Sequence, residues 1–499
     1  AEQVHRNEDT HFFYCWSSIY LSILIICLSC YFNNASSQPP TAAPLIKDTP
    51  FAIIWNAPVD VCKNLKIGLD LSAFQAVTTP ASVPNQFLFL FYTDRLGLYP
   101  YVDPATKQEY NGGIPQKAPL KASLKKATSD IAKYIPNSTP GLAVIDWESW
   151  RPLWVRNWDA KQIYRKLSID SVLAQNSSLS TSMATNIAKE RFQTAARDYM
   201  EDTIQLGIEQ RPEQLWGFYL YPECYNFNWN FPDYTGNCPP TEEARNNELL
   251  WLWESSTALF PSAYLPLTLK DDPKAALFVR GVVKEAVRVS ALPKKNYTSP
   301  IYTYFQPLFR DQNRVYLGQE DLVRTIGESA ALGASGAVLW GASASFNSKV
   351  IKESCEALSA YLLTTLNPHI ANVTAAAKLC STTLCQGNGR CIRKNPNSDD
   401  YLYLNSENFS IQKRRGKYVA VGTPTVTDLL NFADKFTCQC YTDLTCSAKL
   451  AISYFLCSVQ EFKHPYLIVR PYICRLFAVI GWAMVGELKM SVLIGSVYQ

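Results

Sequence analysis

The chain has 499 residues, 47% of them hydrophobic and 18% charged, which is typical of a globular protein and argues against a disordered one. This length suits one large domain with a smaller one. The formal net charge of +4 is small for the length and gives no reason to expect a nucleic acid partner. The layout of the 15 cysteines and the six N-x-S/T sequons favour an oxidising, extracytoplasmic compartment.

The first segment is an apolar stretch, Phe12–Phe32, without a charged residue. Such a stretch near the N-terminus is typical of a signal peptide or a signal anchor. We assign residues 1–38 to this segment and a short linker. Cleavage of a signal peptide would remove three cysteines, Cys15, Cys27 and Cys30. The expected localisation is therefore secretion or the extracellular face of the plasma membrane.

Seven apolar, β-rich runs follow within residues 39–375, the predicted catalytic domain. They are Phe51–Trp55, Phe87–Tyr92, Leu142–Glu148, Leu215–Tyr221, Ser262–Leu267, Ile301–Phe309 and Gly336–Gly341. Helical patterns lie between several of them, at Ala184–Gly207, Ala275–Val289 and Gln319–Leu332.

Strands that alternate with helices predict parallel β/α units, and continuous apolar strands predict burial on both faces. We therefore expect an α/β fold, a distorted TIM-like (β/α) barrel of about seven strands with its chemistry at the C-terminal strand ends. An open doubly wound sheet is the alternative. No glycine-rich phosphate loop is evident in the sequence to support a nucleotide-binding version of it.

Two carboxyl groups, Asp146 and Glu148, stand at the end of the third run. Residues i and i+2 of a strand share a face, so both groups are expected to project the same way. Two carboxyls this close cannot both ionise easily, and one keeps a proton near neutral pH. A glycosidase needs such an acid to protonate the leaving oxygen. An acidic pair that caps a helix or binds an arginine is the alternative.

Aromatic residues surround this pair in the sequence and at the other predicted strand ends. They are Trp147, Trp150, Trp154 and Trp158 next to the pair, and Tyr92, Tyr219, Tyr221, Tyr264 and Trp340 elsewhere. The four histidines, at positions 5, 11, 369 and 464, lie away from the predicted strand ends. A Ser-His-Asp triad or a histidine-based metal centre is therefore not expected, and no cofactor is implied.

From about residue 376 the cysteines come close together. Cys380, Cys385 and Cys391 precede Cys438, Cys440 and Cys446. This spacing resembles an epidermal-growth-factor-like (EGF-like) module over 376–447 with a long insertion. Zinc ligation is the competing interpretation, and the absence of CxxC pairs speaks against it. The apolar tail, 448–499, is either a degenerate lipid-anchor signal that would attach the chain to a membrane or an alternative terminus.

Several segments together resemble the animal and venom hyaluronidases, from about Pro50 to Cys446. They are Phe51–Pro58, Phe91–Pro100, Gly112–Gln116, Ala143–Pro152, Leu215–Tyr219, Pro222–Asn226, Trp251–Trp253, Leu259–Tyr264 and Gly333–Gly341. Among the branches of the family, the chain is most similar to the sperm-surface and closely related mammalian forms. The resemblance implies cleavage of β-1,4 bonds in hyaluronan, and more slowly in chondroitin, by a monomer on the sperm surface or in the acrosome.

The resemblance also implies a role for each matching residue. The substrate's own acetamido oxygen would act as the nucleophile, with Glu148 as acid and then base. Asp146 would hold the acetamido nitrogen and share a proton with Glu148. Substrate-binding roles fall on Tyr92, Tyr219, Tyr264, Trp340 and Asp311.

The same resemblance implies five disulfides: Cys62–Cys355, Cys224–Cys238, Cys380–Cys391, Cys385–Cys438 and Cys440–Cys446. Cys457 and Cys474 would remain, as a candidate sixth pair. The sequons mark Asn137, Asn176, Asn296, Asn372 and Asn408 as glycosylation sites, and Asn34 as a further one near the predicted signal.

Two positions depart from the family pattern. Val282 stands where arginine is usual, and Glu223 stands where aspartate is usual. Loss of a guanidinium beside a polyanion site would weaken substrate binding or leave a carboxylate unpaired. A non-catalytic hyaluronan-binding or adhesion protein is therefore an alternative function. A chondroitin-preferring hydrolase is another, although Tyr264 favours hyaluronan because the chondroitin-directed branch departs from tyrosine there.

Overall fold

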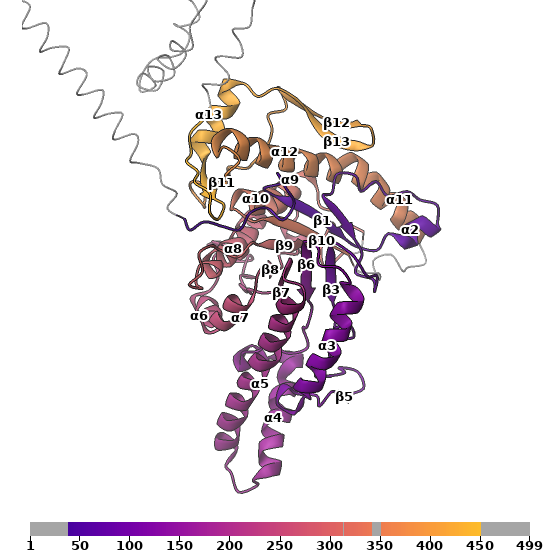
Figure 1. Ribbon diagram of the computed structural model, residues 1–499, viewed down its shortest axis with the longest axis vertical. Helices are drawn as coiled ribbons and strands as arrows, with labels where there is room; N and C mark the ends of the chain where they lie inside the picture. The colour runs from indigo at the N-terminus through magenta and orange to yellow at the C-terminus, as the bar shows by residue number, and fades with distance from the viewer. Residues whose placement is uncertain (1–37, 313, 342–350, 451–499) are drawn as a thin grey trace, which may run out of the picture.

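The computed structural model describes residues 38–312, 314–341 and 351–450 (Figure 1). The predicted signal segment, Asn34, Cys457, Cys474 and all but the first residues of the apolar tail lie outside the described residues. In the part of the chain that is described, no helix is both long and apolar enough to cross a bilayer.

Parallel strands form the centre of the molecule. They are β1 (Ala52–Asn56), β2 (Ala76–Thr78), β3 (Leu88–Phe91), β6 (Gly141–Ile145), β7 (Gln214–Leu220), β8 (Phe260–Pro261), β9 (Tyr302–Phe305) and β10 (Gly336–Trp340). They pair in parallel as two four-stranded sheets, β2-β1-β10-β9 and β3-β6-β7-β8. Two isolated parallel bridges, Leu259–Ile301 and Ser262–Tyr304, link the β8 region to β9.

Apolar side chains from both sheets meet in a single buried cluster. Its members are Ile54, Leu88, Leu90, Leu142, Val144, Ala258, Phe260, Tyr302, Tyr304 and Val338. Strands contribute to one such cluster when their inner faces surround a common interior, as in a β/α barrel. The described residues show no ladder between β2 and β3, so the closed barrel stays a prediction.

One strand prediction needs correction, and one further strand was missed. The fifth strand is β8, Phe260–Pro261, and lies earlier and is shorter than the expected Ser262–Leu267. Pro261 and Pro266 lack N–H groups, which limits the ladder to bridges, and Leu267 begins a 3₁₀ turn. The short strand β2 was not predicted, because three residues with one buried side chain give little pattern.

Helices cover the sheets on the outside. They are α2 (Asp60–Asn64), α3 (Leu120–Tyr134), α4 (Gln162–Gln175), α5 (Thr181–Gln210), α6 (Pro240–Glu248), α7 (Leu250–Ser255), α8 (Lys274–Ser290), α9 (Gln319–Leu322), α10 (Glu328–Ala331), α11 (Ile351–Tyr361), α12 (Asn367–Leu384) and α13 (Val426–Lys435). The first two predicted helical stretches fall within α5 and α8, and the third covers the α9–α10 segment and ends one residue beyond it. Helices α4 and α5 pack together and extend beyond the sheets, while α12 crosses the opposite end (Figure 1).

Small antiparallel pairs complete the structure. They are β4 (Tyr101–Val102) with β5 (Glu109–Tyr110), β11 (Gly389–Arg393) with β14 (Phe436–Cys440), and β12 (Phe409–Arg414) with β13 (Lys417–Gly422). Five disulfides link the described cysteines, in the pairs that the resemblance implied. Helix α12 runs unbroken through the predicted domain boundary at residue 376. The EGF-like nature of the C-terminal segment stays a prediction.

A buried ionic junction joins the C-terminal segment to the helices of the larger part. The carboxylate of Glu328, on α10, lies 2.7 Å from Nε of Arg280 on α8 and 2.8 Å from Nη1 of Arg393 on β11. The side chains of Glu328 and Arg393 are fully buried. Arg280 also contacts Asp399 at 2.7 Å. Two buried guanidiniums therefore share one buried carboxylate, and Asp399 is an exposed second partner of Arg280.

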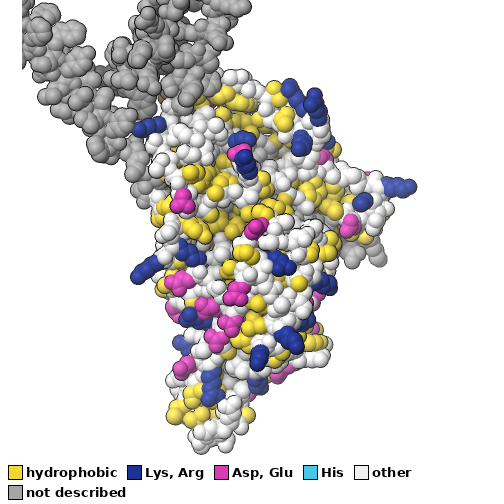
Figure 2. All heavy atoms as spheres, in the orientation of Figure 1, with side chains coloured by type: hydrophobic (Ala, Val, Ile, Leu, Met, Phe, Trp, Pro, Cys, Tyr) yellow, Lys and Arg dark blue, Asp and Glu magenta, His cyan; other side chains and the backbone are white. Residues whose placement is uncertain are grey.

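Charges of both signs are interspersed over the visible face of the molecule, most densely around α4 and α5 (Figure 2). Hydrophobic side chains gather further up on this face, over the strands. The mixture of signs agrees with the small net charge of the sequence.

Candidate active site

The carboxyl pair lies where β6 ends. The N–H of Asp146 donates to the carbonyl of Phe91 at 2.9 Å, which continues the β3–β6 ladder by one residue. The ladder fixes the backbone of Asp146, whose side chain is half-buried, and the chain then turns outward. The side chain of Glu148 is 49% exposed. Of the two carboxyls, Glu148 is therefore the one that a large substrate can reach.

The ionisation of the two carboxyl groups is linked. Burial, followed by the negative charge of Glu148, raises the pKa of Asp146 to about 8. A nearby guanidinium, Arg151, acts in the opposite direction without cancelling the effect. Because the groups interact strongly, the proton belongs to the pair and not to one residue. The pair therefore holds one proton at neutral pH, as the sequence predicted.

Four aromatic residues from four strand ends form a continuous wall beside the pair. Trp340 donates from Nε1 to the hydroxyl of Tyr92 at 3.2 Å. The ring of Tyr264 stacks on Trp340, with centroids 6.1 Å apart and planes 14° apart. The rings of Tyr219 and Tyr264 lie 6.4 Å apart. The structure thus brings together all four aromatic residues that the sequence proposed as substrate-binding.

The tyrosines of this wall remain protonated hydrogen-bond donors. Burial raises the pKa of Tyr264, and burial together with the charge of Glu148 raises the pKa of Tyr219. The hydroxyl of Tyr219 lies 3.3 Å from Oγ of Ser262, a residue not singled out from the sequence. Each side chain of the wall is only partly buried. The wall combines apolar faces with phenol groups, as a sugar-binding surface requires.

A buried charge network lies behind the pair. Nε of Arg151 donates to Glu223 at 2.9 Å, while Nη2 of Arg151 lies 3.6 Å from the carboxylate of Glu148. The second oxygen of Glu223 lies 3.4 Å from Arg156, which also binds Glu242 at 2.8 Å. Glu223 thus has a guanidinium on each oxygen. The network orients Arg151 toward Glu148.

The departure at Val282 leaves no carboxylate unpaired nearby. Glu285, one helical turn further on, lies 2.7 Å from Nε of Arg288 and accepts from Asn246 at 2.6 Å. The side chain of Val282 is buried, at 4% exposure, and lines a hollow next to Glu223. The unpaired carboxylate that the loss of arginine could have left is therefore not found among the described residues around this position. The wall of the hollow nevertheless carries no cationic side chain.

The other predicted site residues lie in different surroundings. Asp311 is exposed, and its carboxylate accepts from the N–H of Leu267 at 2.8 Å, so its visible role is to hold that loop. A residue missed from the sequence is Lys161, whose ammonium donates to the carbonyl of Ser149 at 3.3 Å and to that of Glu148. Burial is the largest cause that lowers the pKa of Lys161 to about 8. Nothing in the sequence pointed to Lys161, because it lies 13 residues after Glu148 and outside the predicted strand ends.

The sequons differ in their exposure. Asn137, Asn176 and Asn296 are exposed, whereas Asn372 and Asn408 are partly buried. Asn372 accepts from the N–H of Leu404, and Asn408 donates to Asp428 at 2.7 Å. Glycosylation at these five positions stays a prediction.

The site can therefore supply one shared proton, an exposed carboxyl to deliver it and an aromatic wall to position a ring. These elements suit acid–base chemistry on a sugar. In the described residues, no group of three or more His, Cys, Asp or Glu is placed to hold a metal ion.

Comparisons with known proteins identify relatives over most of the chain. A family model described as hyaluronidase matches residues 40–450. Mouse Hyaluronidase-5 is 48% identical over 433 residues, which cover 86% of this chain and 81% of that protein. Human Hyaluronidase PH-20 is 47% identical over 411 residues, which cover 82% of this chain and 80% of that protein.

A similar solved structure is bee venom hyaluronidase in complex with a hyaluronic acid tetramer, at 30% identity and a TM-score of 0.57. The match covers 64% of this chain and 98% of the venom enzyme.

Proposed function

Because the chain belongs to the hyaluronidase family, we propose that it hydrolyses the β-1,4 bonds of hyaluronan with Glu148 as catalytic acid and base. The observation that carries this proposal is the proton-sharing pair at the end of β6, whose exposed member is Glu148. The solved complex of a related enzyme with a hyaluronic acid tetramer supports the choice of substrate. The disulfides support an extracellular location, since such bonds persist in oxidising compartments.

The proposed mechanism is substrate-assisted. The acetamido oxygen of the substrate attacks the anomeric carbon while Glu148 gives its proton to the leaving oxygen. Asp146 accepts a hydrogen bond from the acetamido N–H and stabilises the positive charge that develops on that group. Glu148 then takes a proton from water, which opens the cyclic intermediate with retained configuration. Tyr219 and Tyr264 hold the acetamido group, and Trp340 packs against the sugar.

The stereochemistry of the first product tests this mechanism. Proton NMR of an early digest should show the β-anomer before mutarotation produces the α-anomer. Removal of the N-acetyl groups from hyaluronan should abolish cleavage, because the substrate would lack its internal nucleophile. Initial release of the α-anomer would contradict the mechanism. Binding of hyaluronan without any cleavage would favour the adhesion alternative.

The shared proton predicts the alkaline limit of activity. The raised pKa of Asp146 means that the pair keeps its proton up to about pH 8, so activity should fall as the pH rises through that value. Asp146→Asn removes one of the two carboxyls, so repulsion between two negative charges no longer keeps a proton on the pair. The alkaline limb of kcat against pH should therefore move to lower pH, together with a fall in kcat.

The matched control is Asp170→Asn, which removes a carboxyl on α4 that is 48% exposed and paired with Lys166. Its profile should overlay that of the wild type. An Asp146→Asn enzyme with an unmoved alkaline limb would show that the limit arises from another group.

A further inference from the structure

A rigid loop presents aromatic side chains beside the active site. The disulfide Cys224–Cys238 closes this loop. It lies so close to α8 that a Cβ on Gly281 would stand 1.8 Å from the carbonyl oxygen of Gly236. Asn226 reinforces the contact by donating to Gly236 at 2.6 Å. The loop is therefore held in place, and what it exposes is fixed in position.

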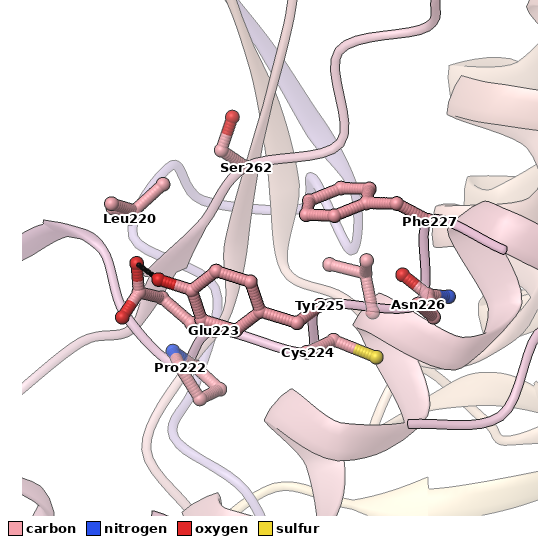
Figure 3. Close-up of a pocket in the computed structure, with 9 residues that line it drawn as sticks. Leu220, Pro222, Glu223, Cys224, Tyr225, Asn226, Phe227 and Ser262 are labelled. Atoms are coloured by element: carbon pink, nitrogen blue, oxygen red, sulfur yellow. Dashed lines mark hydrogen bonds between the residues drawn. The ribbon is translucent and has the colours of Figure 1, made fainter. Parts of the chain in front are cut away.

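The loop exposes large apolar rings. Phe227 is 46% exposed and Phe231 is 60% exposed, while Trp229 is nearly covered at 9%. Exposed aromatic rings on a rigid loop are costly to solvate and commonly mark a binding surface. Phe227 also lines the hollow that contains Val282, and its ring points into that hollow, on whose wall Ser262 also lies (Figure 3).

An arginine from another loop lies over two of these rings. The guanidinium of Arg310 stands 5.5 Å from the centroid of Phe227 and 5.6 Å from that of Trp229. Its backbone N–H donates to the carbonyl of Leu265 at 2.8 Å, directly after Tyr264 of the aromatic wall. The backbone of Arg310 is thus held next to the wall, and its side chain packs on the aromatic loop.

Among the described residues, no ion pair within 4.0 Å and no side-chain hydrogen bond involves the guanidinium of Arg310. The neighbouring Asp311 acts on Arg310 through its charge alone, without direct contact. Asp311 directs its carboxylate to Leu267. The carboxylate of Glu223, which lines the same hollow as Phe227, is occupied by Arg151 and Arg156. The N–H donors of Arg310 therefore remain available, on the exposed side, for an external anion.

We propose that Arg310 and Phe227 form a further subsite of the cleft, in which Arg310 binds a uronate carboxylate of the substrate and Phe227 stacks on a sugar ring. This inference rests on the proposed function for the identity of the polymer. A carboxylate recurs on every second sugar of hyaluronan, so a cation close to the aromatic wall can meet one of them. A guanidinium suits this task, because it binds a carboxylate through two parallel hydrogen bonds. Arg310 also places a cation over the ring of Phe227, which lines the hollow that carries Val282 in place of the usual arginine.

Binding measurements in the Glu148→Gln background test the proposal without consumption of the ligand. The probes are a short hyaluronan oligosaccharide and the same oligosaccharide with its carboxyls reduced to alcohols. Arg310→Gln should weaken binding of the acidic oligosaccharide about 10-fold, at the lower end for a hydrogen bond to a charged group because the site is partly exposed. It should leave binding of the reduced oligosaccharide nearly unchanged. The affinity of Arg310→Lys for the acidic oligosaccharide should lie between the affinities of the parent and of Arg310→Gln.

The control variant is Arg191→Gln, which removes an exposed cation in the N-terminal half of α5, where it contacts Gln175. It should bind both oligosaccharides as the parent does. Equal weakening of both probes by Arg310→Gln would show a merely structural role and overturn the proposal, as would no weakening of either. Hydrolysis by the wild type is scored separately. If oligosaccharide binding depends on Arg310 but the wild type does not hydrolyse hyaluronan, the subsite is upheld and the catalytic function is rejected. If the wild type hydrolyses hyaluronan but binding does not depend on Arg310, the catalytic function is upheld and the subsite is rejected.

Discussion

Glu148→Gln is expected to lower kcat for hyaluronan by about 10²- to 10⁴-fold, the usual contribution of a positioned acid and base. Glutamine keeps the size and the polar character of the side chain but cannot deliver a proton. The exposed position of Glu148 means that the exchange should cost little stability. The dissociation constant for a hyaluronan oligosaccharide should therefore stay close to that of the wild type, while hydrolysis almost stops.

The matched control is Glu320→Gln, the same exchange at a carboxylate on α9 that is 66% exposed and paired with Arg324. Its kcat should equal that of the wild type. A Glu148→Gln enzyme with a kcat within a few-fold of the wild type would remove this residue from the mechanism. Loss of oligosaccharide binding together with loss of turnover would point to a binding role.

The second large effect is expected on stability. Glu328→Gln should lower the free energy of unfolding by about 3–5 kcal/mol, because it leaves two buried guanidiniums without their shared countercharge. Urea denaturation followed by tryptophan fluorescence measures the change. Glu320→Gln is the control here too. It should lower the free energy of unfolding by only about 0–1 kcal/mol, because it removes an exposed ion pair.

Hydrogen exchange can locate the effect of Glu328→Gln. The amides of β11 and β14 should lose protection first, because Arg393 on β11 is the partner that ties this segment to α10. If the variant unfolds at the same urea concentration as Glu320→Gln, the junction contributes little to stability. Uniform loss of protection throughout the protein would show that the junction does not act locally.

The strands could be predicted from the sequence because they are buried on both faces and read as continuous apolar runs. The runs at 51–55, 87–92 and 336–341 overlap β1, β3 and β10 closely. The strand β8 was placed late, because Pro261 ends the ladder there while apolar residues continue to Leu265. Burial of a side chain and membership of a ladder are different properties, and only the first leaves a clear pattern.

The site, too, has a part that could be predicted from the sequence and a part that could not. Asp146, Glu148 and the aromatic wall were predictable because each lies at a strand end, where parallel strands bring their carboxyl ends to one edge. The charged partners of Glu223, by contrast, are Arg151 and Arg156, on a distant segment that only the fold brings close. The role proposed for Arg310 could not be predicted from the sequence either, because it depends on two rings more than 80 positions away.

The most direct test of the catalytic function is the length of hyaluronan chains after incubation with the wild-type protein, followed by light scattering across roughly pH 4 to 8. We expect a progressive loss of chain length that ends as the pH rises through about 8, where the carboxyl pair gives up its proton. Intact chains at every pH, with a protein that circular dichroism shows to be folded, would contradict the catalytic function.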